Sequence, residues 1–361
     1  MITKGMQRQF HRDGFLVVPN ALGQKDVGIL RREADNLINY LISSDINIMT
    51  DYGGIIEPIT CGYIDPPMSQ MFIMSKKSYS HVRHQVTEGG DTVIDILFEI
   101  VPEMASTFLP QESEDEPICL FNEQYIVKTP DSASTSSFEW HQDAQYMDTG
   151  AQGKFPVVSC WIALDNVNLA NGTLLVEPFP RPKDARTGGH VDPPALFQDR
   201  DVYLQYHRNL ASHYVNPPAN KMTAIMKAQN RPPLLPPPAP TAMSVAMDSL
   251  PTNPKEWVCE SQAPVLVEVP AGSIVFLSGW VRHCSLGNSS SKFRRAFMPQ
   301  YSAGKVVTET GGLVSLAVPC NEHDHEREKG DDQYREDEDL LDDDFGRAEE
   351  LDFGEDIEMD D

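Results

Sequence analysis

The sequence predicts a mainly β protein with flanking helices, and two observations lead to this expectation. Strand-like apolar runs fill residues 117–180 and return at 264–302, with tight-turn signals such as Asn171-Gly172 between them. Before these runs, apolar residues between Lys25 and Ile42 recur at helical spacing. Hydrophobic residues make up 40% of the 361 residues, enough to bury a sizeable core.

Residues 1–116 are expected to support this core from outside, as a helical and mixed N-terminal part. Residues 13–19 form a predicted short strand, 25–42 an amphipathic helix and 92–101 a second helix. The Gly- and Pro-rich stretch 52–67 is predicted to be irregular.

The β-rich core is predicted over residues 117–302. Its expected strands are 118–128, 155–167, 173–176, 265–269, 273–277, 282–285 and 294–301. A long excursion, about 181–256, interrupts them, and 10 of the 39 residues from 216 to 254 are proline. This density excludes interior strands and long helices there. The excursion is either a folded lid or a disordered spacer.

Negative charge is concentrated at the C-terminus. After a short extension at 303–321, residues 322–361 carry 21 acidic against 4 basic residues, a net charge of −17 out of −25 for the chain. We expect this tail to be disordered, because it has too few apolar residues for a core. The acidic balance argues against nucleic acid as a partner, since neutralising phosphates requires a basic face. The tail could contact a basic partner, although a solubilising role is the simpler interpretation.

Nothing in the sequence indicates a membrane or export. No window approaches the ~18 apolar residues of a membrane span. The N-terminus lacks the apolar region of a secretory signal, and the last residues are not a peroxisomal address. The six cysteines include no CxxC pair, which suits reduced thiols. A cytoplasmic protein is therefore expected.

Three residues are candidate metal ligands. His141 and Asp143 lie two residues apart in a segment predicted to be extended, so both side chains can point to one face. Antiparallel pairing can place His283 opposite them. Two imidazoles and one carboxylate form a facial triad, which suits iron(II) and leaves three adjacent sites open. Taken alone, each motif could instead be a surface His beside a solvated Asp, or a buried structural His.

Two arginines, Arg294 and Arg295, open the last predicted core strand. Arginine binds a carboxylate through two parallel hydrogen bonds and keeps its charge. The far carboxylate of a 2-oxo acid that chelates iron would meet such a residue. Strand alternation lets only one of the two point inward. The alternative is that both are solvated and paired with acidic neighbours.

These motifs, in this order, resemble the phytanoyl-CoA dioxygenase family of iron(II)/2-oxoglutarate-dependent oxygenases. The resemblance covers residues 9–22 and 118–302 without the excursion. The matching segments are 13–18, 124–130, 140–143, 161–165 with Asn171-Gly172, and 272–279 followed by 283–285, Asn288 and Arg294. The sequence departs from the family at Pro178–Pro182, where a Pro-Gly-Ser-His turn is usual, so the substrate entrance is expected to differ.

The resemblance implies a double-stranded β-helix, a cupin-like jelly roll of two packed sheets with helices on one side. It implies that iron(II) is held by the catalytic residues His141, Asp143 and His283. It also implies a pocket for the co-substrate 2-oxoglutarate lined by Arg294, Lys128, Trp161 and Ser285. Strand alternation adds Gln124 to that interior. With dioxygen as second co-substrate, the implied reaction is hydroxylation, or another oxidation, with release of succinate and carbon dioxide.

The excursion guides the expectation for the prime substrate. It offers aromatic and apolar groups but no dense Lys/Arg cluster, whereas the phosphates of a coenzyme A thioester favour a basic mouth. We therefore expect a small, largely apolar organic molecule. Two alternatives stay open, an acyl-CoA 2-hydroxylase of the phytanoyl-CoA type and a non-catalytic jelly-roll adaptor whose acidic tail recruits partners.

Overall fold

Two antiparallel sheets with helices around them make up the computed structural model of the chain. The structure describes residues 1–63, 73, 75–84, 92–110, 113, 116–146, 156–214, 257–307 and 311–320. All of them belong to one compact unit, Met1–Asn321. The expectations for the acidic tail and for the Pro-rich stretch 216–254 lie outside the described residues.

The large sheet has the strand order β1-β10-β5-β12-β3-β13, with β2 also paired to β3. Its strands are β1 (Phe15–Val18), β2 (Ile55–Ile56), β3 (Ile118–Lys128), β5 (Val157–Ala163), β10 (Ile274–Ser278), β12 (Arg294–Ala303) and β13 (Val318–Pro319). The long pair β3 and β12 runs antiparallel from Arg294 opposite Lys128 to Ala303 opposite Ile118, with one bulge at Gln300. This pair lies at the centre of the large sheet and carries several of the predicted site residues.

The small sheet has the order β4-β11-β6-β9, and a separate ribbon pairs β7 with β8. These strands are β4 (Phe138–His141), β6 (Leu174–Glu177), β7 (Arg181–Asp184), β8 (Trp257–Glu260), β9 (Val265–Leu266) and β11 (Arg282–Ser285). The chain alternates between the sheets, from β3 to β4, β5 to β6, and β10 through β11 to β12. This alternation is the double-stranded β-helix, so the predicted fold class is confirmed.

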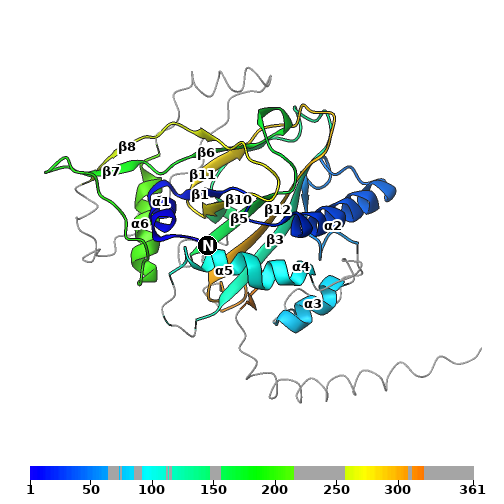
Figure 1. Cartoon of the computed structure of the whole chain (residues 1–361), viewed down its shortest axis with the longest axis horizontal. Helices are drawn as coiled ribbons and strands as arrows, with labels where there is room; N and C mark the ends of the chain where they lie inside the picture. Colours follow the sequence, from blue (N-terminus) through cyan, green and yellow to red (C-terminus); the bar gives the residue numbers. More distant parts are fainter. Residues whose placement is uncertain are drawn as a thin grey trace, which may run out of the picture. The chain divides into compact units, whose positions relative to one another are not determined.

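Helices cover the outer face of the large sheet. They are α1 (Lys4–Asp13), α2 (Gln24–Ser43), α3 (Lys76–His84), α4 (Thr92–Asp95), a π-helical turn (Ile96–Ile100) and α5 (Val101–Ser106), whereas α6 (Arg200–Ser212) packs against the inner core. Figure 1 shows α4 and α5 on one side of the large sheet, with β6 and β11 on the other. None of the helices in the described ranges is long and apolar enough to cross a membrane.

The helix expected at 92–101 has a wide π-helical turn in its middle. Pro102 lies directly after this turn. Because proline has no N–H, it cannot bond the carbonyl four residues earlier, and its ring crowds that carbonyl. The ladder therefore shifts to the wider i→i+5 pattern over Ile96–Ile100.

Alternating side chains divide the apolar residues of the large sheet between two cores. Tyr125 and Val127 of β3 and Cys160 of β5 face the outer core with the helices, whereas Ile126 and Trp161 face the core between the sheets. Successive strand residues point to opposite faces, which explains the division. Helix α6 also packs into the inner core, so the first part of the excursion, residues 181–214, is folded.

Candidate metal centre and co-substrate pocket

The structure brings His141, Asp143 and His283 together. Their potential ligand atoms all lie within 4.8 Å of one another. Strands β4 and β11 are neighbours, with His141 opposite His283 in the register. Asp143 Oδ1 lies 3.6 Å from Nε2 of both histidines. Asp143 reaches this point differently from the sequence expectation, because β4 ends at His141 and Asp143 opens a 3₁₀ turn.

Both imidazoles are oriented by the backbone. Nδ1 of His141 lies 2.7 Å from the Glu139 carbonyl oxygen, and Nδ1 of His283 lies 3.2 Å from that of Val281. A carbonyl oxygen only accepts, so Nδ1 carries the hydrogen and Nε2 offers its lone pair to a metal. Burial, and next the nearby His141, lower the pKa of His283 to about 4, which keeps it neutral as a metal ligand must be.

Asp143 presents its two oxygens to different partners. Oδ1 faces the histidines, whereas Oδ2 accepts a hydrogen bond of 2.5 Å from the Ser159 hydroxyl. Ser159 was not among the predicted site residues; it lies within the apolar run of β5 and is fully buried. A signal was available, because Ser159 shares the strand alternation of Trp161 and is the polar residue on the inward-facing side of that strand.

Arg294 is fully buried between the sheets. Its guanidinium carbon lies 5.6 Å from the centre of the Trp161 ring, and Nη2 donates to the Gly172 carbonyl at 3.0 Å. Arg294 Nε and Trp161 Nε1 are buried without a hydrogen-bond partner. Among the described residues no carboxylate pairs with Arg294. Burial lowers its pKa to about 9, opposed in part by Asp165, so a lone positive charge faces the interior at neutral pH.

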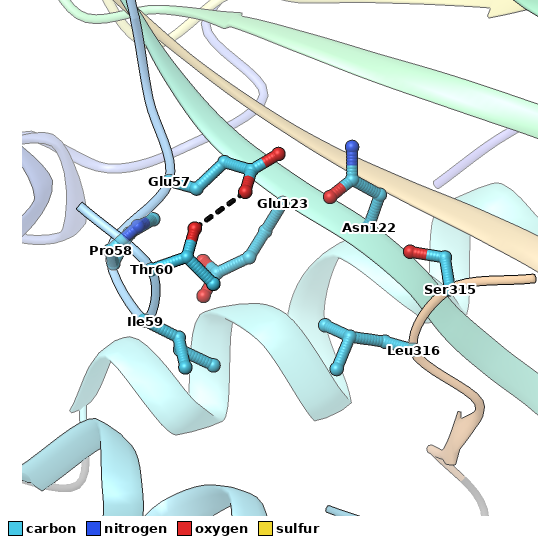
Figure 2. Close-up of a pocket in the computed structure, with 8 residues that line it drawn as sticks. All are labelled: Glu57, Pro58, Ile59, Thr60, Asn122, Glu123, Ser315 and Leu316. Atoms are coloured by element: carbon cyan, nitrogen blue, oxygen red, sulfur yellow. Dashed lines mark hydrogen bonds between the residues drawn. The ribbon is translucent and has the colours of Figure 1, made fainter. Parts of the chain in front are cut away.

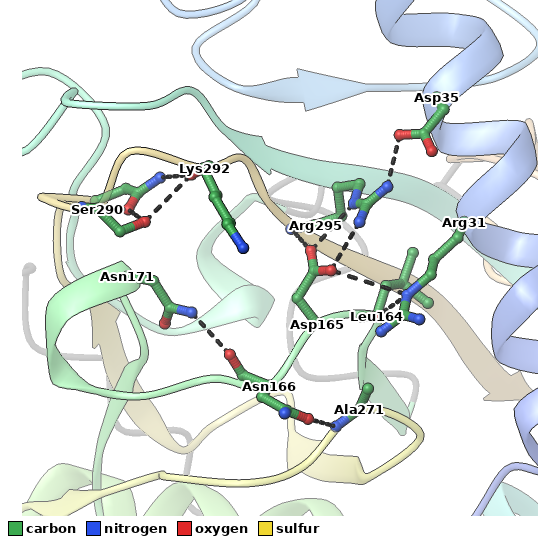
Figure 3. Close-up of polar contacts among 11 residues, drawn as sticks. Arg31, Asp35, Leu164, Asp165, Asn166, Asn171, Ala271, Ser290, Lys292 and Arg295 are labelled. Atoms are coloured by element: carbon green, nitrogen blue, oxygen red, sulfur yellow. Dashed lines mark hydrogen bonds and ion pairs between the residues drawn. The ribbon is translucent and has the colours of Figure 1, made fainter.

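Arg295 points the other way, to the outer face of the sheet. Its backbone and side chain bind Asp165 at 2.7 to 3.0 Å, and Nη1 donates to Asp35 of α2 at 2.6 Å. Figure 3 shows Asp165 between Arg295 and Arg31, with Asp35 on the helix above. These bonds fix the register of β12, and they leave the inward position to Arg294.

Three further predicted pocket residues lie on strands that border the same interior, Lys128 and Gln124 on β3 and Ser285 on β11. Lys128 is the register partner of Arg294, and its ammonium donates to Ser285 Oγ at 2.8 Å and to the carbonyls of Ser136 and Leu286. Lys128 therefore holds the surrounding segments together. Gln124 lies four residues earlier on β3, half-buried, and its side chain bonds to none of the described residues.

A polar pocket of about 60 Å³ lies elsewhere in the described part of the chain (Figure 2). Its lining residues are Glu57, Pro58, Ile59, Thr60, Asn122, Glu123, Ser315 and Leu316. None of the predicted site residues belongs to this lining. The pocket is therefore distinct from the triad, although Asn122 also contacts the inner face of the large sheet through Gln300.

The donor set suits an iron ion with a chelating dicarboxylate. Two neutral imidazoles and one carboxylate occupy three sites and leave three for other ligands. A lone buried cation is unfavourable, and Arg294 would gain a partner from a carboxylate placed over Trp161. The orphaned N–H groups of Arg294 and Trp161 would gain acceptors at the same time.

Comparison with known proteins identifies the family. The family model described as phytanoyl-CoA dioxygenase (PhyH) matches residues 10–296, which is most of the chain. No curated protein matches the sequence.

Several solved structures of low sequence identity are similar to this chain. The epimerase SnoN in complex with Fe³⁺, α-ketoglutarate and nogalamycin RO is 15% identical, with 88% of this chain and 94% of that chain covered and a TM-score of 0.45. EvdO2 from Micromonospora carbonacea var. aurantiaca, complexed with 2-oxoglutarate, is 17% identical, with 84% and 92% covered and a TM-score of 0.42. The non-heme monooxygenase ThoJ–Ni complex is 15% identical, with 93% and 97% covered and a TM-score of 0.41.

Proposed function

Because the chain belongs to the phytanoyl-CoA dioxygenase family, and is therefore an iron(II)- and 2-oxoglutarate-dependent dioxygenase, we propose that it hydroxylates or otherwise oxidises a small, largely apolar organic substrate. The observation that carries the 2-oxoglutarate-dependent chemistry is the fully buried Arg294. It lacks a carboxylate partner among the described residues and faces the same interior as the triad. This arrangement suits a ligand that supplies a negative charge.

Each site residue has a role in this proposal. His141, Asp143 and His283 hold iron(II), and Arg294 binds the distal carboxylate of 2-oxoglutarate over the Trp161 ring. The side chains of Lys128, Ser285 and Gln124 line the co-substrate pocket. The bound iron and 2-oxoglutarate supply the oxidising power, with succinate and carbon dioxide as by-products.

The protein contributes orientation and the exclusion of water. The Nδ1 bonds to backbone carbonyls aim both imidazoles at one point. Apolar side chains of the inner core surround the triad and the arginine, which strengthens the pairing of Arg294 with a carboxylate. This inner core includes Ile126, Trp161, Leu174, Val176 and Met298.

Two features favour an apolar substrate. The inner core that adjoins the triad is apolar, with Val176 as the register partner of His283. In addition, three basic residues of β7 and β11 are paired with carboxylates. The pairs are Arg282 with Glu177, Arg181 with Asp13 at 3.1 Å, and Lys183 with Glu260 at 2.6 Å. Paired cations are poor partners for the phosphates of a coenzyme A thioester.

The test is a competition between substrate classes. A branched acyl-CoA, its free acid and a neutral analogue are offered separately, and substrate-dependent succinate is measured at low and moderate salt. Turnover of the acid or the neutral analogue, insensitive to salt, is expected. Turnover confined to the thioester and weakening with salt would instead establish the alternative, acyl-CoA 2-hydroxylation.

Family membership sets aside the non-catalytic adaptor as a description of residues 10–296. The acidic segment 322–361 lies outside the described residues, so its contact with a basic partner stays a prediction. Removal of residues 325–361 with unchanged iron binding would separate the tail from catalysis, because every candidate site residue lies within Met1–Asn321.

A further inference from the structure

A chain of side-chain hydrogen bonds crosses the inner face of the large sheet and ends on Asp143. Asn122 of β3 donates to Gln300 Oε1 at 3.2 Å, Gln300 Nε2 donates to Ser159 Oγ at 2.7 Å, and Ser159 donates to Asp143 Oδ2 at 2.5 Å. The first three residues lie on adjacent strands. Gln300 is the register partner of both Asn122 and Ser159.

The direction of these bonds is determined by the carboxylate at the end. An ionised Asp143 only accepts, so the single hydroxyl hydrogen of Ser159 is committed to it. Ser159 can then only accept from its other side, which requires the NH₂ end of the Gln300 amide. The amide oxygen of Gln300 therefore faces Asn122, which must donate. Each group in these three bonds therefore has one allowed orientation.

The central residues of this hydrogen-bond chain are buried. Ser159 is fully buried and Gln300 is 8% exposed, so water cannot readily replace the lost partners. The bulge in β12 lies at Gln300, where a register shift separates it from Tyr301. Bulges re-aim side chains, and this one accompanies the turn of the Gln300 amide toward Ser159.

We propose that Asn122, Gln300 and Ser159 are positioning residues that hold Oδ2 of Asp143, so that Asp143 binds iron through Oδ1 alone. The inference rests on the proposed role of Asp143 as an iron ligand. Oδ1 is the oxygen that faces both histidines, at 3.6 Å from each Nε2. A carboxylate bound through one oxygen leaves three adjacent metal sites open for the co-substrates, whereas a carboxylate free to rotate could occupy one of them.

The first test removes the hydroxyl. Iron(II) affinity is measured anaerobically by competition with a chromogenic chelator, and the visible absorption of the iron–2-oxoglutarate complex is recorded. We expect Ser159→Ala to weaken iron binding by roughly 10- to 100-fold, the usual effect of losing such a partner of a metal ligand, and to weaken the absorption band. The matched control is Ser302→Ala on β12, a buried serine that donates to the Gly304 carbonyl at 2.8 Å.

The second test reverses the direction of the hydrogen bond between Gln300 and Ser159 without reducing the side-chain volume. Gln300→Glu replaces the NH₂ donor with an acceptor of the same shape, so the Ser159 hydroxyl turns to the new carboxylate and leaves Asp143. We expect a loss of iron affinity like that of Ser159→Ala. Gln300→Ala tests the same link without adding a buried charge. Because Gln300 acts through Ser159, the Ser159→Ala/Gln300→Ala double variant should bind iron no more weakly than Ser159→Ala alone.

The outcomes separate this inference from the proposed function. Thermal unfolding of the metal-free variants shows whether each one folds like Ser302→Ala. Loss of iron affinity in Ser159→Ala and Gln300→Ala, with Ser302→Ala unchanged, supports the positioning chain. Iron affinity and absorption like the unmodified protein in both variants, or the same loss in Ser302→Ala, overturns it. Normal iron binding by His141→Ala would instead overturn the metal centre itself.

Discussion

Arg294 and Arg295 are adjacent in β12, yet their side chains lie on opposite faces of the sheet and contact different residues. Arg294 lies in the inner core with a lone charge over Trp161, whereas Arg295 is bound by Asp165 and Asp35 on the outer face. The difference follows from strand alternation, which predicts that only one of the two arginines points inward. Which one does so depends on the register of β12 against β3, and Asp165 secures it.

This geometry predicts different effects for two matched substitutions. Arg294→Ala should raise the KM for 2-oxoglutarate strongly, as the loss of a buried charged pair worth about 2–5 kcal/mol would. Arg295→Ala should leave that KM nearly unchanged, because its side chain contacts only the outer face. Succinate release over a range of 2-oxoglutarate concentrations measures both. A large rise in KM for the Arg295 variant alone would show that the two side chains are exchanged.

At the scale of elements, the turn between β5 and β6 connects the fold to the site. The sequence predicted a tight turn at Asn171-Gly172, and the structure has a 3₁₀ turn capped by Asn168 and ended by Gly172. Gly172 has a φ of +86°, and its carbonyl accepts from Arg294. A Cβ at this position would lie 2.5 Å from the Leu286 carbonyl oxygen and 2.9 Å from Lys128 Cδ.

Gly172→Ala should therefore affect both stability and the co-substrate. Left-handed backbone strain costs about 1–2 kcal/mol, and the clash with backbone adds to it and displaces the carbonyl that holds Arg294. We expect a lower melting temperature and a higher KM for 2-oxoglutarate. Gly53→Ala is the control, since Gly53 has a φ of +60° but open space around its Cβ position. Equal changes in the two variants would mean that the close packing at Gly172 is unimportant.

Local pattern predicted some elements well and missed others. The strand at 118–128 and the helix near 25–42 were found because their apolar residues repeat at clear periods over long runs. Helix α6 was missed, although Tyr203, His207 and Leu210 follow helical spacing, because the proline density of the surrounding excursion dominated the interpretation. Asp143 was placed on a strand because sequence spacing does not show where β4 ends.

At the scale of the whole molecule, the hydrogen-bond chain to Asp143 could not be predicted, because it depends on the register between strands that are far apart in the sequence. The link from Asn122 through Gln300 to Ser159 joins residues up to 178 positions apart, and its existence depends on the pairing of three strands and on one bulge. The triad was easier to expect, because its residue types already indicate metal chemistry. Serine, glutamine and asparagine carry no such signal by themselves.

Two buried histidines couple the stability of the whole molecule to pH. His11 Nδ1 lies 3.3 Å from His207 Nε2, and His207 Nδ1 lies 2.8 Å from Ser278 Oγ, in an aromatic cluster with Phe197 and Tyr203. Burial lowers the pKa of His11 from 6.5 to about 3. Burial, together with His11, also lowers the pKa of His207. Both are therefore neutral in the folded protein at neutral pH.

The direction of the pH dependence follows from these shifts. Below about pH 6.5 the unfolded chain binds protons at both histidines, whereas folded His11 does so only near pH 3. The free energy of unfolding should fall as the pH falls through this window, and His11 alone should contribute about 2 kcal/mol of that fall at pH 5. Denaturant unfolding of the metal-free protein measures it. His11→Gln should reduce the slope. Identical slopes would contradict the buried neutral pair.

The most direct measurement of the central claim is anaerobic titration of the metal-free protein with iron(II) and 2-oxoglutarate. A triad at His141, Asp143 and His283 with a chelated 2-oxo acid should give a visible charge-transfer band at roughly 500 nm. The band should be absent in His141→Ala, and it should need more 2-oxoglutarate in Arg294→Ala. A protein that binds no iron, or that shows the same band in His141→Ala, would contradict the assignment of this site.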